Sequence, residues 1–142
     1  MLSENQLLNH IYQTAEMGGE GIRSVLKYTE EPKLADALNS QLTEYEKLQN
    51  AAGSLLQARG EPPKGLNPMA KASSEVMSTV KAMTDRSAAN IAEMMIQGST
   101  MGVTKSLRTI RDCDVHDDTV RRLADKLLKT EQANIEEMKR FL

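Results

Sequence analysis

Apolar and small residues recur every three or four positions along most of the chain, the pattern of amphipathic helices. A first helix is predicted from near Ser3 to the segment before Pro32, because Ser suits a helix cap and Pro a first turn. Its stripe is Leu7 or Leu8, Ile11, Ala15, Gly18, Ile22 and Val25. A second helix is predicted from Pro32 to Gly60. Its stripe is Leu34, Leu38, Gln41, Tyr45, Leu48, Ala52 and Leu55.

The segment ARGEPPKGLNP (58–68) interrupts this pattern, because Gly can cap a helix end and Pro-Pro blocks its continuation. Helical phasing resumes over 69–83, after an Asn-Pro pair suited to a helix start. A longer helix is predicted from about Asp85 to Arg111, capped by Thr84 or Asp85. Its stripe is Ala92, Ile96, Ser99, Val103, Leu107 and Ile110. The pattern leaves open whether 69–111 is one kinked helix or two.

The last helix follows the loop DCDVHDD (112–118), whose Asp117 or Asp118 is suited to cap it. One face of this helix carries Val120, Leu123, Leu127, Glu131, Asn134, Met138 and Phe141. No alternation typical of strands is present. The sequence therefore predicts an all-α fold, a four-helix bundle of two helical hairpins with a long crossover and an extra short helix. Residues 1–142 form one domain, with hairpin one at about 3–59, the crossover at 60–67 and hairpin two at 68–142.

Two pairs of segments suggest an internal repeat. GIRSVLKY (21–28) is similar to GVTKSLRT (102–109), and LADAL (34–38) is similar to LADKL (123–127). The repeat relates positions in the two halves: it pairs Gly18 with Ser99, Leu42 with Glu131, and Tyr45 with Asn134.

Composition narrows the function classes. A net charge of −2 and only four aromatic residues argue against nucleic-acid binding, and nine Met suit gap-filling between helices. The single cysteine, Cys113, excludes an internal disulfide and fits a reducing compartment. The N-terminal segment lacks the features of a signal peptide, and no apolar run reaches the ~20 residues of a membrane span. We therefore expect a cytoplasmic protein that does not contact membranes.

Two helices carry a family resemblance. AEMMIQGSTMGVTKSLRTI (92–110) resembles the third helix of small bacterial ferritin-like proteins, and LADKLLKTEQANIEEMKRFL (123–142) resembles the fourth, which carries Glu-x-x-His. The resemblance extends over nearly the whole chain and implies a ferritin-like bundle. In metal-loaded members, two helices each supply one Glu and two each supply Glu-x-x-His. The corresponding positions here are Gly18, Leu42, Tyr45, Ser99, Glu131 and Asn134.

Only Glu131 survives of those six ligand positions, so the resemblance implies a degenerate di-iron site, and we expect no metal and no cofactor. If the ligand pattern is aligned to other positions of the helices, the metal ligands could instead be Glu16, Glu20, Glu44, Glu46 or Glu93. The loop DCDVHDD could be a metal or redox site or a solvated capping loop, and it lacks the ligand spacing of zinc or EF-hand sites. Cys113 has no paired base in the sequence, and no catalytic constellation is visible, so we expect no enzymatic activity.

Polar residues on the apolar stripes define a candidate site. They are Glu131, Asn134, Ser99, Tyr45 and Gln41. They could form a pocket in the bundle core or a buried patch that is satisfied by internal hydrogen bonds. The glycine-rich segments MGGEG (17–21) and GSTMG (98–102) could likewise line a ligand cavity or permit close helix approach.

The main functional hypothesis is a non-enzymatic structural or protein-interaction module, expected to be a homodimer. The contact would use the outer faces of the first and third helices or the segment 69–83, because the methionines cannot all pack into one core; they are Met77, Met83, Met94, Met95 and Met101. The alternative is a small-molecule or residual metal binder that uses the polar residues. A second alternative, by analogy with ferritin-like coat proteins, is a spore-coat-type component.

Overall fold

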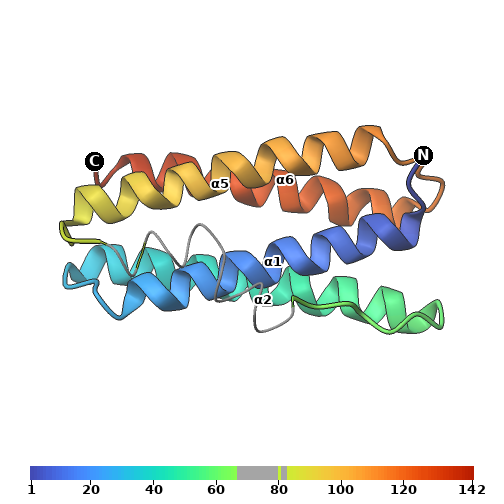
Figure 1. Ribbon diagram of the computed structural model, residues 1–142, viewed down its shortest axis with the longest axis horizontal. Helices are drawn as coiled ribbons and strands as arrows, with labels where there is room; N and C mark the ends of the chain where they lie inside the picture. The colour runs from blue at the N-terminus through green and yellow to red at the C-terminus, as the bar shows by residue number, and fades with distance from the viewer. Residues whose placement is uncertain (67–79, 81–82) are drawn as a thin grey trace.

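The computed structural model describes residues 1–66, 80 and 83–142, and within these ranges the chain forms four α-helices. They are α1 (Glu4–Leu26), α2 (Pro32–Ala58), α5 (Ala88–Arg111) and α6 (Asp118–Lys139). α1 packs against α2 and α5 against α6, so two helical hairpins lie on each other (Figure 1). The predicted all-α four-helix bundle is confirmed. The helix expected over 69–83 lies, apart from Val80 and Met83, outside the described residues.

The crossover between the two hairpins connects opposite ends of the bundle. α1 and α6 run in one direction and α2 and α5 in the other, so α2 ends and α5 begins at opposite ends of the bundle (Figure 1). The start of this long crossover is fixed to α1. The Lys64 amide donates to Asn9 Oδ1 at 2.9 Å, and the Gln13 side chain donates to the Lys64 carbonyl at 2.8 Å. The Leu66 amide donates to the Glu16 carboxylate at 2.6 Å.

The helix termini follow from local capping chemistry. Ser3 accepts the Gln6 amide in a capping box, and Asp117 accepts the Thr119 amide, as the sequence predicts. α5 does not start at Asp85. Its cap is Ser87, whose hydroxyl accepts the Asn90 amide at 3.2 Å, while Asp85 instead accepts the Ser87 amide in the turn before the helix. Gly60, with φ +75°, ends α2 as expected.

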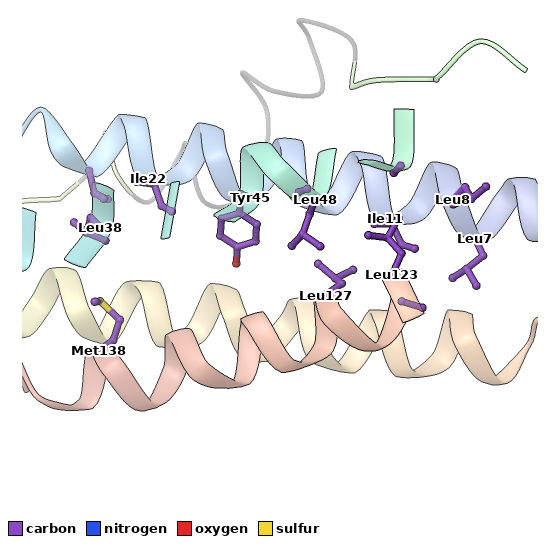
Figure 2. Close-up of a cluster of buried hydrophobic side chains, with 14 of the residues drawn as sticks. Leu7, Leu8, Ile11, Ile22, Leu38, Tyr45, Leu48, Leu123, Leu127 and Met138 are labelled. Atoms are coloured by element: carbon purple, nitrogen blue, oxygen red, sulfur yellow. The ribbon is translucent and has the colours of Figure 1, made fainter. Parts of the chain in front are cut away.

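The core lies between the hairpins and consists mainly of aliphatic side chains. Those that are fully buried include Leu7, Leu8, Ile11, Ile22, Leu34, Leu38, Leu48, Leu56, Ile91 and Leu127, and many are shown in Figure 2. Most of them belong to the predicted stripes, and Leu56 and Ile91 each lie one position away from a predicted stripe residue. Burial of these faces stabilises the bundle. Met83 is also buried, which removes it from the methionines expected to contact a partner.

A network at the α1 N-terminus holds the loop DCDVHDD against the first hairpin. The Glu4 carboxylate accepts the amides of His116 at 2.9 Å and Asp117 at 2.8 Å, and Arg59 contacts Asp117 at 2.8 Å. The Asp117 amide is the main cause that lowers the Glu4 pKa, with Arg59 contributing. Burial raises the pKa of the Cys113 thiol, so the thiol is the stable form near neutral pH. The loop therefore makes the contacts of a capping and docking segment.

Candidate functional site

Four of the five predicted polar residues meet in the middle of the bundle. Tyr45 comes from α2, Ser99 from α5, and Glu131 and Asn134 from α6, and all four are buried. The Tyr45 hydroxyl points from α2 toward the second hairpin (Figure 2), where it lies in hydrogen-bonding contact with Asn134, Ser99 and Glu131. The fifth residue, Gln41, is buried but not part of this cluster. It is one turn away on α2, and its amide donates to Glu137 at 2.8 Å.

Two glycines make room for this cluster. A Cβ on Gly18 would lie 2.6 Å from Cζ of Tyr45, and a Cβ on Gly102 would lie 2.5 Å from Oε1 of Glu131. Real Cβ contacts are not that short, so any side chain here would displace the tyrosine ring or the carboxylate. Each glycine-rich segment therefore allows a neighbouring helix to project a large polar group into the core. Gly98 differs, because a Cβ there would meet no atom of the described residues within 4 Å.

The Glu131 carboxyl is held in a low-dielectric setting. Burial raises its pKa to about 8, and the hydrogen bond with Tyr45 only partly opposes this. At pH 7 the group is therefore mostly a neutral acid, able to donate as well as accept a hydrogen bond. Burial first, and then the Glu131 charge, raise the pKa of Tyr45 above its ordinary value, so the phenol keeps its proton.

Asn134 leaves one polar group unsatisfied. Its side chain is 6% exposed and lies beside the Tyr45 hydroxyl, yet its Nδ2 has no hydrogen bond of standard geometry among the described residues. A buried N–H without an acceptor costs about 1–3 kcal/mol. Among the described residues, the Tyr45 hydroxyl is the polar group that Asn134 contacts within the cluster.

The cluster opens into a cavity of about 570 Å³ between α1 and α5. Glu131, Tyr45 and Ser99 are the buried polar members of its lining and define its deep end. The walls include four thioethers, those of Met17, Met94, Met95 and Met101. Met101 is 45% exposed, so it lies toward the mouth. The glycine-rich segments thus both admit polar groups and border a cavity.

His10, which is not among the site residues predicted from the sequence, also lines the cavity. Its Nε2 lies 3.0 Å from the Ser106 hydroxyl and 3.4 Å from the Thr14 hydroxyl. Burial, followed by the Lys105 charge, lowers its pKa, so the imidazole is neutral at pH 7. His10, Thr14 and Met17 are spaced four and three apart and share one helix face, a signal present in the sequence.

The di-metal ligand pattern is not assembled. Within the described ranges, no three His, Cys, Asp or Glu side chains come together as metal ligands. The neighbours of Glu131 are a phenol, a hydroxyl and an amide, and one carboxylate cannot bridge two hard cations. Gly18 and Tyr45 pack on each other, and Leu42 is half-buried. The residues present therefore do not fit a di-iron centre.

The five glutamates that an alternative alignment of the ligand pattern would use lie elsewhere, and most of them make other contacts. Arg23 pairs with Glu20 at 3.3 Å and with Glu46 at 3.4 Å, and Lys47 pairs with Glu44 at 3.3 Å. Glu16 accepts the Leu66 amide, and Glu93 is exposed. These acids form surface and loop contacts, so this alignment does not create a second metal-ligand set.

Comparison with solved structures identifies two similar folds. A DUF305 fragment from Deinococcus radiodurans aligns with a TM-score of 0.74 and 17% identity, over 96% of this chain and 92% of that one. A structure described as CopM in the Cu(II)-bound form aligns with a TM-score of 0.74 and 12% identity, over 99% and 95% of the two chains. No family model and no curated protein sequence matches the chain.

These similarities establish the class of fold, a four-helix all-α bundle. At such low identity they show the fold alone. Within the described ranges, none of the helices has the length and apolar character that crossing a bilayer requires.

Proposed function

We propose that the chain is a non-enzymatic binding module of the ferritin-like type, without a di-metal centre, whose cavity takes up a small amphipathic molecule. The observation that carries this proposal is the buried Glu131–Tyr45–Ser99 cluster at the deep end of a thioether-lined cavity. A few convergent polar groups in a largely apolar recess are typical of ligand sites, and about 570 Å³ lies within their usual size range.

Two features support binding over simple core packing. Methionine side chains are flexible and polarisable, so the walls can adapt to ligands of different shape. Gly98 lines the cavity and faces open space, although Ala would favour the helix by ~1 kcal/mol. The proposed setting is a bacterial cytoplasm.

Filling the cavity tests this function. Leucine at Gly98 would occupy open space without a close contact at Cβ, whereas Thr100→Leu places the same side chain at an exposed position of α5. We expect the wild type and Thr100→Leu to enhance the fluorescence of the neutral dye Nile red equally. Gly98→Leu should abolish most of the enhancement. Equal dye binding by all three proteins would refute the cavity as a binding site.

Copper is a second candidate ligand, favoured by the four thioethers and the neutral His10 imidazole that border one cavity. Thioethers are soft ligands that select Cu(I), and CopM, which has the same fold, is described in a Cu(II)-bound form. Competition with bicinchoninate would measure Cu(I) affinity. Met94→Leu with Met101→Leu should weaken it, and the core substitution Met138→Leu should not. Unchanged affinity in the double variant would exclude this candidate.

A homodimer remains our proposal for the assembly. α5 exposes Leu107, which does not line the cavity and which a second copy would cover. Light scattering should give twice the chain mass of 15.7 kDa, and a monomer at high concentration would contradict the proposal.

A further inference from the structure

We infer that the ligand of this cavity carries a primary ammonium group, which binds at the deep end to the oxygens of Glu131, Tyr45 and Ser99. The inference rests on the proposed function, because it names the chemical class of molecule that the same cavity would take up.

The deep end of the cavity offers acceptors that match the donors of a primary ammonium. Three side-chain oxygen groups, a carboxylate, a phenol and a hydroxyl, border the deep end and are linked by hydrogen bonds through Tyr45. A primary ammonium has three N–H donors and no acceptor, so it can donate to all three groups at once. A neutral alcohol or carbonyl satisfies fewer of them.

The charge of the ionised Glu131 carboxyl also favours a cationic ligand. Among the described residues, no positive side chain stabilises the Glu131 carboxylate, and its only favourable partner is Tyr45. A buried carboxylate without a cation is strongly disfavoured, and an ammonium would supply the missing positive charge. Hydrogen bonds between such charged partners are about twice as strong as neutral ones.

Among the described titratable groups that line the cavity, only Glu131 can supply the negative charge that pairs with an ammonium. α2 contributes Tyr45, which stays protonated, and α1 contributes His10, which is neutral at pH 7. α5 contributes Lys105, which is exposed, so water and salt screen its repulsion of a cation. The rest of the described wall is mainly thioether and glycine with Leu66, which suits an aliphatic chain behind the ammonium, and its other polar side chains are the neutral Gln13 and Thr14.

Binding should release a proton, because the neutral Glu131 acid must ionise to pair with an ammonium. The proton leaves the Glu131 carboxyl for the buffer, and the cation takes its place. A carboxyl with a pKa of about 8 is about nine-tenths protonated at pH 7. We therefore expect release of about 0.9 proton per ligand at pH 7, and a Kd about tenfold lower at pH 9 than at pH 7.

Isothermal titration calorimetry with n-hexylamine tests the inference. Titrations at pH 7 in phosphate and in Tris, which differ in ionisation enthalpy, give the number of protons released. n-Hexanol has the same chain without the charge, so it should bind more weakly and release none. In Glu131→Gln, proton release should vanish and the Kd should change by less than about twofold between pH 7 and pH 9. The control Glu137→Gln, on the same helix but outside the cavity, should behave as the wild type.

The outcomes separate the two claims. If n-hexanol binds as tightly as n-hexylamine, or if n-hexylamine releases no proton, the ammonium inference is overturned while the cavity stands as a binding site. If neither compound binds and Nile red is insensitive to Gly98→Leu, the proposed function itself fails. Proton release that persists in Glu131→Gln would also overturn the inference, because another group would then be the acid.

Discussion

The buried Glu131 carboxyl should make the stability of the bundle fall as pH rises. In the unfolded chain the pKa of this group is near 4.5, and in the folded bundle burial raises it to about 8. The folded state therefore binds the proton more tightly, so this contribution to stability is fully present below pH 4.5. It declines as pH rises and is lost completely once pH exceeds 8.

The magnitude follows from the two pKa values. Each pH unit between them is worth 1.36 kcal/mol, which gives a total of about 5 kcal/mol, with about 4 kcal/mol of it falling between pH 5 and pH 9. Net stabilities of small domains are typically 5–15 kcal/mol, so one group should dominate the alkaline stability of this protein.

The assay compares the wild type with Glu131→Gln, which keeps the shape of the side chain and removes its titration. Urea unfolding at pH 5, 7 and 9 without ligand gives both free energies, and their difference cancels the groups that the two proteins share. We expect the wild type to lose about 4 kcal/mol more than the variant between pH 5 and pH 9. Parallel pH profiles, differing by less than about 1 kcal/mol in slope over that range, would refute the reasoning.

Further predictions concern the glycines and the network at the end of the bundle. Gly102→Ala should lower the unfolding free energy by about 1–3 kcal/mol, because its Cβ would displace the Glu131 carboxylate, and the loss should disappear in a Glu131→Ala background. Gly98→Ala, which faces open space, should instead raise it by up to ~1 kcal/mol; a loss there would contradict the cavity geometry. Arg59→Ala should move acid unfolding, followed by circular dichroism, to higher pH, because Arg59 helps to lower the Glu4 pKa and stability is lost as pH falls through that value. An unchanged acid midpoint would show that the network has no role in stability.

The helices and much of the core were predictable from the sequence because both depend on local rules. Ser3, Pro32 and Asp117 carry capping or first-turn chemistry in their own side chains, and helical periodicity identifies the faces to be buried. The third helix shows where this reasoning fails. Leu107 lies on its predicted stripe but is 37% exposed, while the adjacent Ser106 is fully buried and its hydroxyl pairs with His10 from α1.

The candidate site was predictable only in part, because part of it depends on how the two hairpins pack together. Tyr45, Ser99, Glu131 and Asn134 could be grouped because each interrupts an apolar stripe that had to face the same core. The cavity, the role of His10 and the pairing of Gln41 with Glu137 depend on how the two hairpins pack, which no single helix encodes. From the sequence, the glycine-rich segments could either line a cavity or permit close helix approach. The structure distinguishes the two roles: a Cβ on Gly18 would collide with the Tyr45 ring, whereas a Cβ on Gly98 would meet no described atom within 4 Å.

The central claim is that the cavity above Glu131 binds a ligand, and its own methionines can report on this directly. With ¹³C-methyl-methionine labelling, a two-dimensional NMR titration with n-hexylamine observes Met17, Met94, Met95 and Met101 on the cavity wall together with Met138 in the core. We expect saturable shifts of the four cavity methyl signals and an unchanged Met138 signal. If the cavity signals stay fixed, or if Met138 shifts as much as they do, the claim is contradicted.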